Sequence, residues 1–145
     1  MATLREAVQS LLAGDATLVS TLTGGVYDRR EINRTAMPGA YDARGNLEPC
    51  AVVALSTQNE IAPHPEYAGF TEEFLFVYYY EQEGNSYAAI DVAMERVRTL
   101  LHGQRVTVTL GTVFEIRHAD GNSNLYDDAL RAEMGYDRFV VWRKR

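Results

Sequence analysis

The sequence predicts an α+β fold, a mostly antiparallel β-sheet with two main helices packed on one of its faces and long loops between the elements. Residues 3–14 and 86–103 place apolar side chains at helical spacing, and several short β-rich runs lie between and after them. The resulting order is helix, strand, strand, strand, helix, strand, strand. The 145 residues are a normal length for one core, so we expect a single domain over 1–145.

The first helix has clear start and stop signals. Thr3 and Glu6 have the spacing of a capping box, and Gly14 is placed to end the helix. The apolar positions of one helical face are Leu4, Val8, Leu11 and Leu12. Residues 15–25 repeat the scheme as a short helical turn with Asp15 as its cap, and a strand begins at "VYDRR".

Two irregular stretches follow, one on each side of the predicted strand "CAVVALSTQ". Residues 31–49 and 59–69 contain all four prolines of the chain and no sustained periodicity. Long loops of this kind are often functional, although any single residue in them is as well explained as a solvated loop residue. Our candidate contact residues are Arg29, Arg30, Arg34 and Tyr41 around the first stretch and His64, Glu66 and Tyr67 in the second.

The run "EFLFVYYYEQ" predicts a central strand from about Phe70 to Tyr80 that is covered on both faces in its second half. Alternation places one set of side chains on one side, Phe74, Phe76, Tyr78 and Tyr80, and the other set, Leu75, Val77 and Tyr79, on the opposite side. We expect one side to pack against the helices and the other against a neighbouring subunit or a second layer. Stacking on nucleic acid is disfavoured, because glutamates surround the aromatics and residues 61–91 contain no lysine or arginine.

The second main helix is predicted over residues 86–103, with Ser86 as N-cap and Gly103 as the stop. Its apolar stripe is Ile90, Ala93, Met94, Val97, Leu100 and Leu101. Two strands follow, at residues 105–119 and 136–145, and between them turn residues are expected to precede a short stretch that is itself compatible with an extended conformation. In the terminal "WRKR", Trp142 is expected to pack in the sheet, whereas Arg143 and its neighbours are either a fraying tail or a dock for an acidic partner surface.

No catalytic, cofactor-binding or metal-binding residue is predicted. The single cysteine, Cys50, lies in a strand and is expected to be buried, and the residues around His118 and Asp120 match no standard metal motif. The net charge of −6 argues against general affinity for nucleic acid. No apolar run is long enough to cross a bilayer and no secretory signal is recognised at the N-terminus, so we expect no membrane partner.

With the elements in this order, the chain resembles the tail terminator, or tail completion, proteins of long-tailed bacteriophages. The resemblance covers nearly the whole chain. The matching stretches are "LREAVQSLLAGDATLVSTL" followed by "GGVYDRR", "EPCAVVALS" after a proline-bearing loop, "EFLFVYYY", "AAIDVAMERVRTLLHG" and the aromatic C-terminal "DRFVVWRK". These are patterns of order and hydrophobicity, and they transfer no catalytic residue. The long segment 31–49 departs from the shorter family members.

The resemblance implies a structural protein of the virion tail or neck, made in the host cytoplasm. Such proteins form a ring, expected to be a hexamer, that ends polymerisation of the tail tube and joins the tail to the head connector. The implied partners are other copies of the chain, the tube protein and the connector or stopper protein, while DNA passes through the lumen without specific binding. The alternatives are another connector, neck or tube subunit, or a small ligand-binding or metal-dependent enzyme with its pocket near the tyrosines and His118.

Overall fold

The computed structural model describes residues 3–28, 32, 35, 37–60, 70–109 and 111–144, without the side chains of residues 56–60 and 70. Helix α1 spans Leu4–Ala13, and its predicted capping box is confirmed, because the Thr3 side chain and the Glu6 side chain each accept the other's backbone N–H. Helix α2 spans Ala16–Thr21 and is capped by the Asp15 carboxylate, as predicted. A short 3-10 helix, η1, spans Pro38–Ala40.

Five strands form one sheet in the spatial order β1-β2-β3-β5-β4. The strands are β1 (Gly25–Tyr27), β2 (Cys50–Glu60), β3 (Phe70–Gln82), β4 (Thr112–Asp127) and β5 (Ala132–Lys144). All neighbouring pairs are antiparallel except β1 and β2, which run parallel. The prediction of a mostly antiparallel α+β fold is confirmed.

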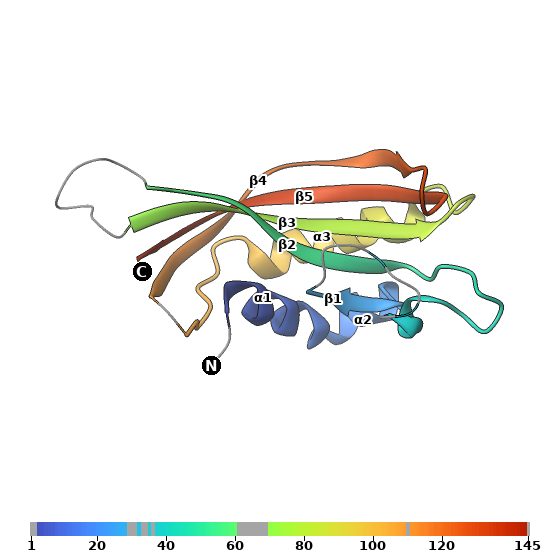
Figure 1. Ribbon diagram of the computed structural model, residues 1–145, viewed down its shortest axis with the longest axis horizontal. Helices are drawn as coiled ribbons and strands as arrows, with labels where there is room; N and C mark the ends of the chain where they lie inside the picture. The colour runs from blue at the N-terminus through green and yellow to red at the C-terminus, as the bar shows by residue number, and fades with distance from the viewer. Residues whose placement is uncertain are drawn as a thin grey trace.

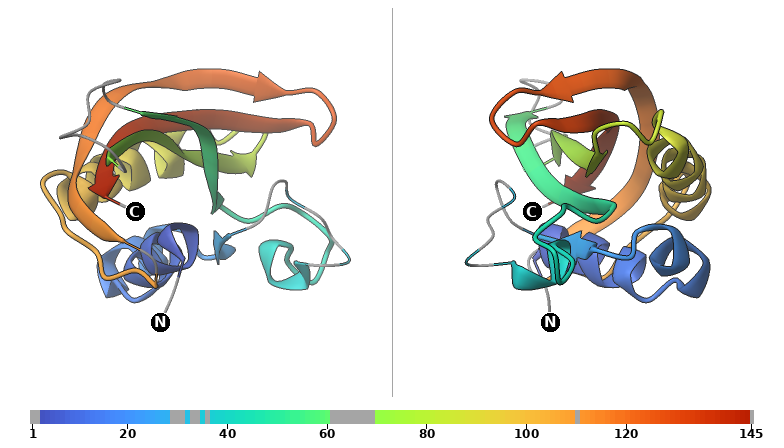
Figure 2. Two further views of the ribbon diagram at one scale, coloured as in Figure 1. Left: turned by 60° about the vertical axis from the view of Figure 1, so that its left-hand side comes forward. Right: turned by 90° about the vertical axis from the view of Figure 1, so that its right-hand side faces the viewer.

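The helices α1, α2 and α3 (Ala88–Leu101) lie on one side of the sheet, as Figures 1 and 2 show. Their apolar stripes pack against the inward-pointing side chains of β2, β3, β4 and β5 to form the main core. The predicted stripe of α3 is buried there, with Leu100 at its margin. Leu75, Val77 and Tyr79 belong to this core, which confirms that this side of β3 faces the helices.

Two predictions about the second half of the chain were wrong. Ser86 is not the N-cap of α3: it has a φ of 57°, and the helix begins at Ala88 after Tyr87, which has a φ of 61° and makes no capping bond through its side chain. The backbone N–H groups of Gly84, Ser86 and Tyr87 instead donate to the Glu133 carboxylate of β5 at 3.1, 3.2 and 2.7 Å. A distant carboxylate replaces the local serine cap.

The stretch 120–135 is not a turn region between two short strands. Strand β4 continues through Gly121 and Asn122 to Asp127, and the chain reverses only at residues 128–131. The turn-forming residues are accommodated by three irregularities in the β4–β5 register, at Val113/Glu115, His118/Asp120 and Asn122/Leu125. Within the last of these, the Asn122 side chain accepts the Asn124 N–H at 2.8 Å, so an Asx hydrogen bond, typical of turns, forms inside a strand.

Candidate subunit interface

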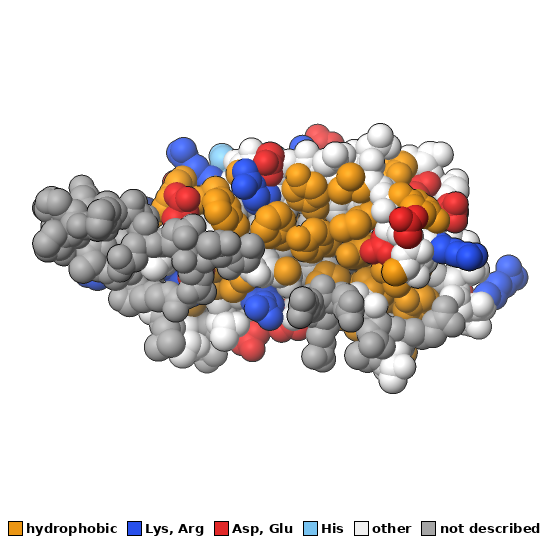
Figure 3. Space-filling view, turned by 45° about the horizontal axis from the view of Figure 1, so that its top comes forward, with side chains coloured by type: hydrophobic (Ala, Val, Ile, Leu, Met, Phe, Trp, Pro, Cys, Tyr) orange, Lys and Arg blue, Asp and Glu red, His pale blue; other side chains and the backbone are white. Residues whose placement is uncertain are grey.

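The outer face of the sheet, opposite the helices, has an aromatic surface at its centre. We call it the open aromatic face and define it by Phe74, Phe76, Tyr78, Tyr136, Val140 and Trp142. These residues alternate along β3 and β5 with the buried side chains of the main core, and each is half-buried. Figure 3 shows a band of hydrophobic side chains running along this face of the molecule, with charged side chains at its margins.

The rings of this face contact one another across the two strands. Phe76 and Tyr78 stack with centroids 5.6 Å apart and planes inclined by 5°. Tyr136 meets both rings from β5, at 6.2 Å from Phe76 and 6.4 Å from Tyr78, because the antiparallel register pairs it with Tyr78. These contacts along β3 and across to β5 restrict the rings, a property that favours binding because little side-chain entropy is lost.

One end of the outer face is covered by the chain itself. A second, smaller hydrophobic cluster forms where the segment before β2 crosses the sheet, and Met37, Ala40 and Leu47 pack there with Cys50 and Val52. Cys50 is fully buried as predicted, and burial raises the pKa of its thiol to about 12, so the side chain is a protonated packing residue at neutral pH. The cover reaches Tyr78, which packs against this cluster, and the described part of the chain leaves the rest of the open aromatic face uncovered.

Among the described residues, two ion pairs and one lone carboxylate surround the open aromatic face, and the lone carboxylate, Glu72, accepts a hydrogen bond from Trp142 Nε1 at 3.1 Å. Arg138 binds Asp120 in a two-pronged contact at 2.9 and 3.0 Å, and its guanidinium lies 5.0 Å from the Phe74 ring centre. Arg117 pairs with Glu115 at 3.2 Å. These pairs make the margin polar and nearly neutral, and this pattern of an apolar centre with a polar rim is typical of protein interfaces.

His118 and Asp120, considered above as parts of a possible catalytic or metal site, are separated in the structure. His118 Nε2 lies 2.8 Å from Oδ1 of the buried Asp137, which also accepts hydrogen bonds from Arg98 Nε at 2.9 Å and from the Tyr79 hydroxyl at 2.8 Å. Asp120 points to the opposite face and binds Arg138 there. The Asp137 cluster connects α3, β3, β4 and β5, so its geometry is that of a structural anchor.

No metal centre takes shape around these groups. Among the residues that the structure describes, no three histidine, cysteine, aspartate or glutamate side chains are grouped to hold an ion. Glycine at position 121 is required for the anchor, because a Cβ there would lie 2.6 Å from Asp137 Oδ1. The residues that the structure describes contain no helix with the length and apolarity of a membrane span.

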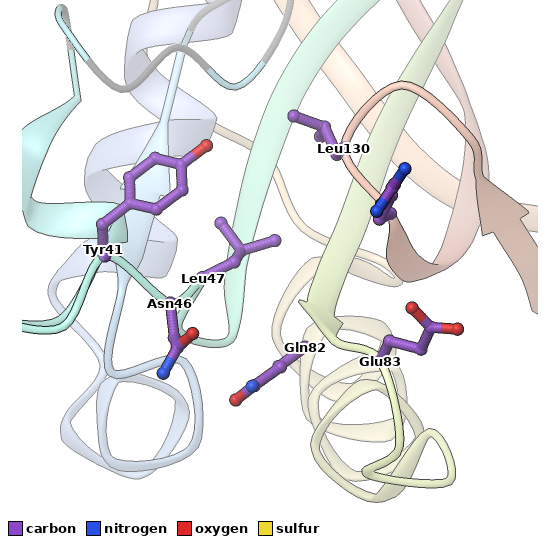
Figure 4. A pocket seen from close by; sticks show the side chains of 8 residues that line it. Tyr41, Asn46, Leu47, Gln82, Glu83 and Leu130 are labelled. Atoms are coloured by element: carbon purple, nitrogen blue, oxygen red, sulfur yellow. The ribbon is translucent and has the colours of Figure 1, made fainter.

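A polar hollow of about 380 Å³ lies at one end of the sheet, where three segments converge. Figure 4 shows Tyr41, Asn46 and Leu47 on one side of it and Gln82, Glu83 and Leu130 on the other. Tyr41, one of our candidate contact residues, therefore lines a surface depression formed by loops. Its contact role stays a prediction.

The other candidate contact residues have different outcomes. Arg29, Arg30, Arg34, His64, Glu66 and Tyr67 lie outside the described residues. Arg143 is not part of a fraying tail: it lies in β5, is 8% exposed, and its Nη2 and Nε are 2.9 and 3.0 Å from Oε1 of the buried Glu73. Its guanidinium is committed to an internal ion pair, and a role in docking a partner stays a prediction.

Tyr136 and Val140 belong to the candidate interface but were not singled out in the sequence. The sequence contains a signal for them, because in "YDRFVVW" they alternate with Asp137, Phe139 and Val141. A strand with this alternation presents Tyr136, Val140 and Trp142 on one side. The missing information was the β3–β5 register, which sets Tyr136 opposite Tyr78 and Val140 opposite Phe74. Sequence spacing does not specify which strands are neighbours.

These features define a class of protein: an α+β domain with a helix-covered core, an uncovered aromatic sheet face and, in its described part, charged clusters that serve as structural anchors. Compared with protein-family models and with curated proteins, the sequence gives no match. Among solved structures, the fold is similar to a chain in the virion of a native gene transfer agent particle, with a TM-score of 0.65 and 17% identity. The similarity covers 98% of this chain and 93% of that chain, so it extends over the whole architecture.

Proposed function

We propose that this protein is a structural virion protein, and more specifically the subunit of a ring at the head-proximal end of a phage-type tail. The observation that carries the proposal is the similarity of fold to a virion chain over nearly the full length of both proteins. The tail terminator assignment comes from the order of the sequence stretches and is the finer part of the proposal. The ring, expected to be a hexamer, ends tube polymerisation and joins the tail to the head connector.

The geometry of the described residues supports an assembling protein. A ring requires that one surface of each copy meets a different surface of the next, and such contacts need an apolar centre. The open aromatic face supplies one, and two arginines at its rim are already paired with carboxylates of the same chain. The net charge of −6 also suits a ring through which DNA passes without binding, because like charges repel.

Electron microscopy of the purified protein tests the proposal directly. We expect rings whose subunits can be counted, and we expect addition of the protein to polymerising tail tubes to arrest their growth with a ring at one end. A protein that stays monomeric at all concentrations and does not bind tube ends contradicts the proposal. Binding assays against purified tubes and purified connectors distinguish a terminator from another neck or tube subunit, because a terminator must bind both.

A further inference from the structure

We infer that the open aromatic face is the contact surface between neighbouring copies of this chain. The inference rests on the proposed ring and deepens it by naming the surface and its occupant, a second copy. The first argument is the pattern of burial. Phe76, Tyr78 and Tyr136 are held in register on the sheet and are already half-buried. Rigid aromatic side chains at the centre of a polar rim are the residues that contribute most to binding between proteins.

The second argument is size. From Tyr136 to Trp142 the face spans seven residues of β5, about 20 Å at ~3.3 Å per residue. Two strands set its width at roughly 10 Å, since strands lie ~4.8 Å apart. The result is an apolar area on the order of 200 Å², the size of the centre of a standard interface of roughly 800 Å² per partner.

The third argument is charge. Arg138 is neutralised by Asp120 and Arg117 by Glu115, and the remaining carboxylate, Glu72, accepts a hydrogen bond from Trp142, so the described part of the face offers no cationic surface for a nucleic acid and only a small negative charge. Copies that each carry a net charge of −6 repel one another over most of their surfaces. A neutral, apolar surface is where such copies approach at the smallest electrostatic cost.

The fourth argument is position. The open aromatic face runs along the length of the sheet (Figure 3), whereas the polar hollow lies where β3 ends at Gln82, and Leu130 lines its other side. Contact between copies through the open aromatic face leaves the end of the sheet available for other components of the particle. Contacts between copies in the ring and contacts with other tail proteins would then use different surfaces of the molecule.

Cysteine footprinting tests the inference with little disturbance of the fold. Cys50 is the single cysteine of the chain and is 0% exposed, so we expect it not to react with the label in the folded protein. Val140→Cys places a thiol of similar size on the open aromatic face, and Val92→Cys, at a position 55% exposed on α3, is the matched control. Both variants are labelled with a maleimide, once in dilute monomeric form and once as isolated rings.

We expect the rate of labelling of Val140→Cys to fall at least about tenfold in the ring, while Val92→Cys reacts equally fast in both forms. If rings form and Val140→Cys reacts as fast in them as in the monomer, the inference is overturned while the proposed function stands. Protection of Val140→Cys only after tail tubes are added overturns it in favour of a different protein partner, and equal protection of both thiols indicates aggregation and also overturns it. The absence of any ring or tube binding defeats the proposed function itself.

Discussion

The two faces of the sheet differ in where their charged and aromatic side chains lie. The helix-covered face contains every buried charged side chain that the structure describes, and each points inward at an odd-numbered position of β3 or β5. They are Glu73, Glu81, Glu133, Asp137 and Arg143. The outer face has aromatic side chains at its centre and ion pairs exposed at its margin. The buried charges thus have partners fixed within the chain, whereas the outer face is mainly apolar and carries, in its described part, one carboxylate, Glu72, that is held only by the Trp142 Nε1–H.

The largest expected effect comes from breaking the Asp137 anchor on the inner face. Asp137→Ala removes the common acceptor of Tyr79, Arg98 and His118 and leaves a buried hydroxyl and two cationic or polar groups without their partner. We expect a loss of about 3–5 kcal/mol of unfolding free energy, measured by urea denaturation. The control is Asp120→Ala on the outer face, where loss of an exposed ion pair costs less than about 1 kcal/mol. Equal losses would contradict the contrast between the faces.

Two arginines of the same strand give the second comparison. Arg143→Met removes an ion pair with the buried Glu73, and we expect it to cost about 2–4 kcal/mol at pH 7. Arg138→Met removes the exposed pair with Asp120, and we expect a change below about 1 kcal/mol. Denaturation curves of the two variants under one set of conditions make the comparison. A neutral Arg143→Met would show that this inner pair is replaceable by an apolar side chain.

The third prediction concerns pH and the inner end of β3. Burial, with a further contribution from the Glu133 carboxyl, raises the pKa of Glu81 to about 7, and Asp91 adds to the same effect. Because the folded state holds this proton more tightly than the unfolded state, the stabilising contribution is complete below about pH 4.5 and is lost as the pH rises towards 7. Glu81→Gln mimics the protonated form and can still accept the Ala89 N–H.

We therefore expect Glu81→Gln to leave stability nearly unchanged at pH 4.5 and to raise it by about 1–3 kcal/mol at pH 8. Thermal unfolding at the two pH values measures the difference. Glu95→Gln, an exposed substitution on α3, serves as the control and is expected to show little pH-dependent difference from the parent protein. A variant that is less stable than the parent at pH 8 would mean that the ionised carboxylate is required to hold the start of α3.

Local signals predicted the parts of the fold that depend on neighbouring residues. Thr3 and Glu6 lie three positions apart, so the capping box of α1 was readable from the sequence, as was the alternation of β3. The start of α3 was not, because the N–H groups of Gly84, Ser86 and Tyr87 just before the helix bind Glu133, which lies 46 residues beyond Tyr87 in the chain. A serine near a helix start caps the helix only when no stronger acceptor from a distant part of the chain binds the same N–H groups.

The long β4 was missed for a related reason. Gly121 and Asn122 are turn formers in isolation, but pairing with β5 and the three register irregularities keep them in a strand. The candidate interface was half predictable. One strand of the open aromatic face followed from the spacing of Phe74, Phe76 and Tyr78, whereas Tyr136 and Val140 required the register between strands far apart in the sequence.

The smallest expected effect on the single chain is at the centre of the open aromatic face. Phe76→Thr keeps a strand-favouring residue and removes a half-buried ring, so in dilute monomer we expect a loss below about 2 kcal/mol. Leu75→Ala, one residue away on the fully buried inner face, is expected to cost about 2–5 kcal/mol. Denaturation at low protein concentration compares the two directly.

Assembly should reverse this ranking. If copies meet through this face, Phe76→Thr weakens their association by about 2 kcal/mol or more, roughly 30-fold in dissociation constant, because a central aromatic contact is lost. Leu75→Ala leaves the outer surface unchanged and should associate normally while it remains folded. Sedimentation velocity over a range of concentrations measures both variants. A Phe76→Thr protein that loses as much monomer stability as Leu75→Ala and assembles normally would show that the outer face is core rather than contact surface.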